Sequence, residues 1–221
     1  RKKTLYENLL KSRKTKVKLG YRSGYAFLNN PKYLGMTLSR YKFVSKMFEG
    51  YEQVLEIGAG DGFKSLVVET ACKNLTLSDI DSKDITAFKK DYSKISKAKF
   101  IKHDFVKSKL DIKFQGIYAL DVLEHVHPLK EQKFLKNVLD SLLKTGSLII
   151  GIPSLESQKY ASPLSKKYHV NCKSKSELKK FLSKYFNSVF MFSMNDEVLH
   201  TGFDQMSHYI IAIATNKKWK K

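Results

Sequence analysis

The sequence predicts an α/β fold, in which a mostly parallel sheet carries helices on both faces. From residue 53 onward, short apolar β-branched segments alternate with segments whose apolar residues recur at helical spacing. The first of these strands stops at a glycine-rich turn over residues 58–62. The last two strands have too few residues between them for a crossover helix, so we expect that pair to be antiparallel.

The strands and helices follow from this alternation in chain order. Strands are expected over residues 53–57, 75–79, 99–105, 114–120, 146–153, 189–194 and 208–215. Helices are expected over residues 62–72, 84–93, 129–144 and 174–186, with a loop over residues 153–173. Gly146 is expected to end the third helix, and Ser174 or Ser176 to cap the start of the fourth.

Residues 1–48 are expected to form an N-terminal helical arm or lid, and residues 49–221 the main domain. Residues 1–20 are basic, with a weak helical pattern. Residues 38–48 carry apolar side chains at helical spacing, so this helix should cover the sheet edge and close over the site. The aromatic-rich segment 21–27 is suited to lining a pocket, although packing of the helix explains those side chains equally well.

The charge balance bears on the kind of partner. Lys and Arg number 41 against 21 Asp and Glu, which gives a formal net charge of +20 and is typical of nucleic-acid or anionic-membrane binders. However, only four of the basic residues are Arg, and the lysines are spread along the chain. Because phosphate recognition favours the bidentate guanidinium, we expect a small, anionic substrate, with a basic nucleic-acid-binding module as the alternative.

The apolar runs and the two cysteines indicate the compartment in which the protein works. No apolar run reaches the ~18 residues of a membrane-spanning helix, and no signal-peptide pattern begins the chain. Cys72 and Cys172 lie far apart without metal-ligand spacing, which is typical of reduced thiols in the cytoplasm. We therefore expect a cytoplasmic protein without a metal site.

The glycine turn over residues 58–62 follows a strand that contains Glu56. Glycines let the backbone adopt positive φ and approach a ligand closely, and the start of a following helix would offer unpaired N–H groups. A plain strand-to-helix turn is the alternative. A dinucleotide fingerprint would need a third glycine where Phe63 stands, so a nicotinamide dehydrogenase is the weaker enzyme interpretation.

Carboxylates stand where ligands bind in open α/β sheets, at the carboxyl ends of the strands. Asp79 follows the second strand, where it is suited to accept both hydroxyls of a ribose, and Asp81 takes that place if the strand is two residues longer. Asp104 and Phe105 follow the third strand and suit the amine and the ring of adenine. Each aspartate alone fits a helix N-cap equally well.

The pattern Glu-x-Gly-x-Gly-Asp-Gly over residues 56–62, followed by Asp79 and Asp104 in order and spacing, resembles the first three motifs of class I S-adenosylmethionine (SAM) dependent methyltransferases. The resemblance covers about residues 50–215. It implies a Rossmann-like sheet of seven strands with the last reversed, and SAM as cofactor with S-adenosylhomocysteine (SAH) as product. The cofactor-binding positions that it implies are Glu56, Gly58, Ala59, Gly60, Asp61, Phe63, Asp79, Ile80, Asp104, Phe105 and Leu120.

Three further segments bear on the acceptor. Residues 122–125, Val-Leu-Glu-His, resemble methyltransferases that act on small molecules, whereas the Asp/Asn-Pro-Pro-aromatic and Pro-Cys motifs of nucleic-acid methyltransferases are absent. Residues 168–178 and 200–209 resemble methyltransferases encoded with bacterial capsule and surface-polysaccharide genes. This resemblance implies methylation of an oxygen, in a phosphoramidate or a sugar hydroxyl.

Histidines follow several of the expected strands, in loops that should open on one rim: His125, His127, His169 and His200. The expected catalytic residues are His125, His169 and His200, because a neutral imidazole can accept a hydroxyl proton near neutral pH. An acceptor that is already anionic needs no base, and the histidines would then orient it. His103 and His208 are expected to be structural.

Overall fold

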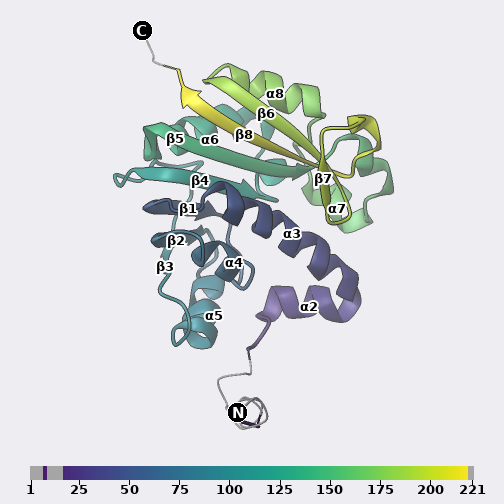
Figure 1. Ribbon diagram of the computed structural model, residues 1–221. Helices are drawn as coiled ribbons and strands as arrows, with labels where there is room; N and C mark the ends of the chain where they lie inside the picture. Colours follow the sequence, from purple (N-terminus) through teal and green to yellow (C-terminus); the bar gives the residue numbers. More distant parts are fainter. Residues whose placement is uncertain (1–6, 9–16, 219–221) are drawn as a thin grey trace.

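The computed structural model describes residues 7, 8 and 17–218, so most of residues 1–20, the first part of the expected arm, lies outside the described residues. One eight-stranded sheet forms the middle of the molecule, in the order β3-β2-β1-β4-β5-β8-β6-β7 (Figure 1). The strands are β1 (Gln53–Ile57), β2 (Asn74–Asp79), β3 (Lys99–Lys102), β4 (Phe114–Leu120), β5 (Leu142–Pro153), β6 (Phe186–Asn195), β7 (Val198–His200) and β8 (Tyr209–Lys217).

Helices cover the sheet and its ends. The α-helices are α2 (Tyr21–Asn29), α3 (Pro31–Met47), α4 (Leu66–Glu69), α5 (Ser82–Tyr92), α6 (Pro128–Ser141), α7 (Pro163–Tyr168) and α8 (Lys175–Ser183). Three short 3-10 helices are η2 (Leu123–His125), η3 (Glu156–Tyr160) and η4 (Asp204–Met206). Strands β1 to β5 pair in parallel, and β8 is antiparallel to both β5 and β6, which confirms the reversed strand near the end of the chain.

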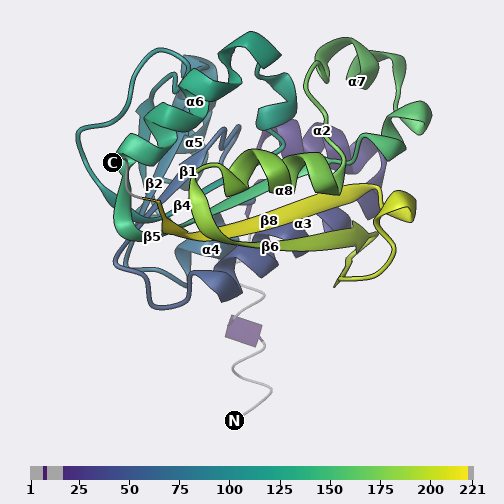
Figure 2. The same ribbon diagram turned by 90° about the horizontal axis from the view of Figure 1, so that it is seen from above.

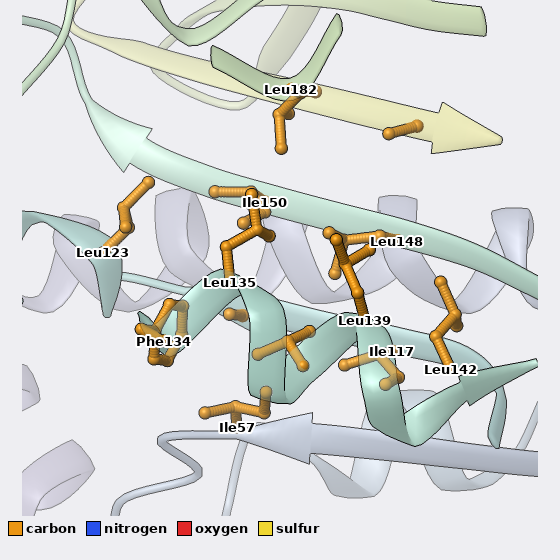
Figure 3. Packing of buried hydrophobic residues seen from close by; sticks show 14 of the residues in the cluster. Ile57, Ile117, Leu123, Phe134, Leu135, Leu139, Leu142, Leu148, Ile150 and Leu182 are labelled. Carbon is orange, nitrogen blue, oxygen red and sulfur yellow. The ribbon is translucent and has the colours of Figure 1, made fainter. Parts of the chain in front are cut away.

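Two apolar clusters hold the layers together, one on each face of the sheet. Helices α6 and α8 cover one face, where Leu135 and Leu139 pack with Ile117 and Ile150 (Figure 3). Helices α3, α4 and α5 cover the other face, with Val44 among their buried side chains. The result is a three-layer arrangement, which Figure 2 shows from above, and it agrees with the expected fold class.

The expected helix over residues 62–72 is wrong in extent, because α4 spans only Leu66–Glu69. Gly58, Gly60 and Gly62 all have positive φ, at 76°, 57° and 72°, and a right-handed helix cannot include such residues. The turn is therefore longer than expected, and no long helix begins beside it to offer N–H groups to a ligand.

Helix α6 ends at Ser141, and β5 begins at the next residue. Gly146 does not end the helix as expected but lies inside β5, where an added Cβ would approach the carbonyl oxygen of Gln115 to 2.8 Å. The register of β4 against β5 shifts between Phe114 and Gly116. Because the Leu142 side chain would also lie only 2.7 Å from that Cβ, a side chain at residue 146 would not fit.

Three further differences concern strands and loops. Strand β3 ends at Lys102, so His103 follows the strand. The expected loop over residues 153–173 contains η3 and α7. Strand β7 was not among the seven strands expected and brings the number in the sheet to eight. It forms a hairpin with β6 around Asp196, whose φ is 49°. Within the described residues, no helix combines the length and apolar character that crossing a membrane requires.

Candidate active site

A cavity of about 730 Å³ opens at the carboxyl ends of the central strands. Ile57 ends β1, Asp79 ends β2 and Leu120 ends β4, and all three residues line the cavity. The chain leaves β1 for β2 on one side and later returns to β4 on the other side. The cavity therefore lies at the topological switch point, where open α/β sheets bind their ligands.

Most positions that the sequence suggested for the cofactor surround this cavity. Nine of the eleven line it: Gly58, Ala59, Gly60, Asp61, Asp79, Ile80, Asp104, Phe105 and Leu120. Asp79 is the last residue of β2, and its carboxylate accepts from the backbone N–H of Gly60 at 2.9 Å and of Asp81 at 3.0 Å. Asp81 caps α5 by accepting from the Lys83 N–H. The structure thus assigns the N-cap to Asp81 and the strand end to Asp79.

Glu56 and Phe63 do not line the cavity, contrary to the expectation. Because side chains alternate along a strand, Glu56 points to the face that α3 covers, where it accepts from the hydroxyls of Tyr41 at 2.8 Å and Tyr118 at 2.6 Å. Burial raises the pKa of Glu56, and its hydrogen bonds oppose that shift. Phe63 packs instead near the ring of Tyr92.

The glycine turn is shaped by packing as much as by the cavity. A Cβ at Gly58 would overlap Val122, and one at Gly62 would overlap Phe88. Gly58 and Gly60 line the cavity, whereas Gly62 does not. Close packing therefore explains Gly62, and a backbone without Cβ atoms faces the cavity at the other two positions.

Helix α2 is joined to the glycine turn and to α5. The buried carboxylate of Asp61 accepts from the backbone N–H of Ser23 at 2.7 Å and from its hydroxyl at 3.1 Å. Arg22 lines the cavity and makes a two-bond ion pair with Asp84, both bonds being 2.8 Å. One wall of the cavity thus comes from the segment before the first strand.

Two histidines and a glutamate meet beside the cavity. The rings of His125 and His169 lie 5.1 Å apart, centroid to centroid, and His125 lines the cavity. Their Nδ1 atoms lie 3.0 Å from the carbonyl oxygen of Tyr168 and from Oε1 of Gln158, respectively. Donor atoms of Glu124, His125 and His169 all lie within 4.8 Å of one another. Two of the three expected catalytic histidines are therefore brought together.

His200, the third, stands apart from this pair. Its Nε2 lies 2.8 Å from Oδ1 of Asn195, and its Nδ1 accepts from the backbone N–H of Gly202 at 3.0 Å. Strand β7, which was not predicted, holds the side chain at the outer edge of the sheet. His200 does not line the cavity, so the structure does not bring it into the cluster that His125 and His169 form with Glu124.

Of the other three histidines, two line the cavity and one has a structural role. His127 caps α6 and lines the cavity. His103 was expected to be structural, yet it also lines the cavity, with Nε2 at 2.9 Å from the carbonyl oxygen of Ser108. His208 accepts from a backbone N–H of the β6–β7 hairpin, which fits the structural role expected for it.

Sequence reasoning missed a buried ion pair at the end of β4. Arg40 of α3 is only 4% exposed, and its Nη1 lies 3.1 Å from Asp121, while its guanidinium lies 3.6 Å from the ring centroid of Tyr209. Burial, followed by the charge of Asp121, raises the pKa of Glu124 well above the usual carboxyl range. The signal in the sequence was the position of Asp121, directly after β4, whose last residue Leu120 lines the cavity.

Comparison with known proteins agrees with this geometry. Residues 54–146 match a family described as "Methyltransferase domain", and this range includes the glycine turn, Asp79, Asp104 and the segment after β4. The chain is a SAM-dependent methyltransferase. Its cofactor is SAM, as expected. No curated protein sequence matches the methyltransferase.

Solved structures share the fold of this methyltransferase. The N-methyltransferase NodS from Bradyrhizobium japonicum WM9, in complex with SAH, is 16% identical, with 87% of this chain and 91% of NodS covered and a TM-score of 0.66. The methyltransferase domain of bacterial CtHen1-C is 14% identical, with 81% and 98% covered and a TM-score of 0.66. The DhpI–SAH complex is 14% identical, with 86% and 85% covered and a TM-score of 0.60. These structural similarities show the Rossmann-like methyltransferase fold, with eight strands among the described residues instead of the expected seven.

Proposed function

We propose that this methyltransferase transfers the methyl group of SAM to an oxygen of a small polar or anionic acceptor. The acceptor class that the sequence resemblance favours is a phosphoramidate or sugar hydroxyl of a bacterial surface polysaccharide. The single observation that carries the proposal is the pair of His125 and His169, with both rings held by carbonyl oxygens at the edge of the cavity. The free thiols of Cys72 and Cys172 support a cytoplasmic site of action.

The cavity fits SAM in size and in chemistry. Its volume of about 730 Å³ lies within the range of small-molecule sites. We assign the methionyl part to the backbone of Gly58 and Gly60, the ribose to Asp79, and the adenine to Asp104 and Phe105. Bound SAM supplies a methyl group on a sulfonium, and the protein has to supply alignment and exclude water.

The histidine pair fits an oxygen acceptor. A carbonyl oxygen only accepts hydrogen bonds, so each Nδ1 carries the proton and each Nε2 keeps a lone pair. Burial and the neighbouring His125 lower the pKa of His169, so its imidazole stays neutral at pH 7. A hydroxyl acceptor would give its proton to one Nε2 atom. An anionic acceptor would instead be oriented by the pair, together with Lys64 and Lys130, which also line the cavity.

We extend the proposal to residues 1–48 as a lid over a domain of residues 49–221. The support is that α2 supplies Arg22 to the cavity wall and is joined to the glycine turn through Ser23. Closure of such a lid would exclude water from the methyl group.

The first test is calorimetric titration of the full chain with SAH. Wild-type protein is expected to bind with micromolar affinity. Asp79→Ala should weaken binding by about 10- to 100-fold, because hydrogen bonds to charged groups contribute about 1.5–3 kcal/mol. Asp81→Ala is the matched control: it removes a nearby carboxylate that caps α5, and SAH affinity should persist. Absence of binding heat from folded wild-type protein would refute the cofactor site.

The second test addresses the acceptor. Release of SAH from SAM is measured with phosphoramidates, sugars with free hydroxyls, and amines as acceptors. Turnover with an oxygen acceptor that is lost in His125→Gln, while SAH affinity is kept, supports the proposal. Turnover with amines alone contradicts it.

A further inference from the structure

We propose that Glu124, His125 and His169 bind a divalent transition-metal ion at the edge of the cavity. Glu124 and His125 come from η2, directly after β4, and His169 from the residue that follows α7, more than 40 positions later. The fold brings the three together, with the donor atoms within 4.8 Å of one another. That separation is suitable for ligands that share one ion, since metal–nitrogen and metal–oxygen bonds measure about 2.0–2.2 Å.

The two imidazoles are held as metal ligands usually are. In His125 the Nδ1–H donates to the carbonyl oxygen of Tyr168, and in His169 it donates to Oε1 of Gln158. The amide nitrogen of Gln158 in turn donates to the carbonyl oxygen of Ser154 at 3.2 Å, which fixes the amide orientation. Such partners fix the tautomer and leave the Nε2 lone pair for an ion.

Glu124 supplies an independent observation. Its side chain is 0% exposed, and neither carboxylate oxygen has a hydrogen-bond partner among the described residues. A buried carboxylate without a partner costs several kcal/mol, and native proteins rarely keep one. The buried arginine nearby, Arg40, is directed at Asp121 and Tyr209. A cation held jointly with the two histidines accounts for the unpartnered oxygens.

The ligand set selects the class of ion. Two imidazoles and one carboxylate suit Mn²⁺, Fe²⁺, Co²⁺ or Zn²⁺ better than Ca²⁺ or Mg²⁺, which prefer oxygen ligands. Three protein ligands leave open coordination positions. Because His125 lines the cavity, those positions are available to an acceptor oxygen, which the ion would orient and whose pKa it would lower. This part rests on the proposed function, and in it the histidines act as ligands and not as bases.

The test uses the full chain without an affinity tag, freed of metal by a chelator and titrated with Mn²⁺ under electron paramagnetic resonance detection. We expect one Mn²⁺ per chain. Glu124→Gln and His169→Gln should each weaken binding by about 100-fold or more. Mn²⁺ at a hundredfold excess over its Kd should raise the Tm of the wild type by about 5–10 °C, and that of these variants much less.

Two further variants separate ligation from general damage. His200→Gln changes a histidine outside the cluster and should leave Mn²⁺ affinity unchanged. Gln158→Ala touches no ligand atom but frees the His169 ring, so affinity should fall by about 10- to 100-fold. The affinity of metal-free protein for SAH, measured on the same samples, should be the same in all five proteins.

The outcomes are distinct. Binding of Mn²⁺, Co²⁺ or Zn²⁺ that depends on Glu124 and His169 supports the metal site. Failure of Mn²⁺ to bind and of Co²⁺ and Zn²⁺ to bind in calorimetric titrations of the same metal-free protein, or affinities unaffected by both substitutions, overturns it. If metal-free protein binds SAH while no ion binds, the metal inference fails and the proposed methyl transfer stands. If metal-free wild-type protein does not bind SAH, the proposed methyl transfer is refuted, whatever the result with metal ions.

Discussion

The buried carboxylate of Glu56 does not line the cavity and accepts hydrogen bonds from the hydroxyls of Tyr41 and Tyr118. Glu56→Gln replaces one acceptor oxygen by an NH₂ group and leaves one hydroxyl poorly paired. We expect a loss of about 1–3 kcal/mol in the free energy of unfolding, with SAH affinity unchanged. Denaturant unfolding and calorimetry measure the two effects. Asp79→Ala should show the opposite pattern, and a large loss of SAH affinity in Glu56→Gln would contradict this assignment.

His169 predicts a pH dependence of stability in metal-free protein. Burial and the neighbouring His125 lower its pKa below the ordinary value of 6.5, so the unfolded chain binds a proton first as pH falls. Stability therefore decreases as pH drops below about 6.5. His169→Gln should make this decrease smaller when Tm is measured between pH 5 and pH 8. Part of the decrease should remain in the variant, because the pKa of His208 is also lowered. An unchanged pH profile in the variant would contradict a lowered pKa at His169.

At the scale of elements, the start of α8 gives a direct test of the capping prediction. Ser174 accepts from the Glu177 backbone N–H, and the Glu177 carboxylate accepts from the Ser174 backbone N–H, which forms a capping box. Ser174→Ala should cost about 0.5–2 kcal/mol of stability. Ser176→Ala is the matched control, since that hydroxyl contacts only the Ser174 hydroxyl, and it should cost little. Equal losses in the two variants would contradict Ser174 as the cap.

Local pattern predicted the elements that depend on local physics. Strands β1 and β4 have the expected bounds, because short buried runs ended by glycine or polar residues leave few alternatives. The extent of α4 was wrong, since Gly62, where the helix was expected to begin, has a φ of 72° that a right-handed helix excludes. Strand β7 depends on pairing with β6, and no periodic pattern in three residues reveals it.

Within the site, too, residues placed by local sequence were predictable, whereas contacts between distant segments were not. The positions of Asp79 and Asp104 at the cavity were predictable, because Asp79 ends β2 and Asp104 lies two residues after the end of β3. The unpartnered, buried carboxylate of Glu124 was not predictable, since its neighbours come from distant parts of the chain, such as Asn171, whose backbone N–H donates to the Glu124 carbonyl oxygen. Contacts between segments so far apart in the chain leave no spacing signal.

At the scale of the whole molecule, the question is whether the segment before the sheet controls access to the cavity. Asp84, fully buried, accepts from Arg22 through two bonds and from the Tyr21 hydroxyl at 2.6 Å. Both partners belong to α2, so this carboxylate joins α2 to α5 through three hydrogen bonds. Ser23, bonded to Asp61, supplies a second contact.

Asp84→Asn should therefore loosen α2 while leaving the sheet intact. The amide has one acceptor oxygen and cannot hold the guanidinium through two bonds. We expect faster amide hydrogen exchange over residues 21–29, and faster release of SAH by several-fold, since removing a buried charged partner mainly raises the dissociation rate. Asp91→Asn, which removes only the exposed pair with Lys18, is the control and should change neither rate. Faster exchange in α2 without any change in SAH release would show that the helix packs on the domain but does not act as its lid.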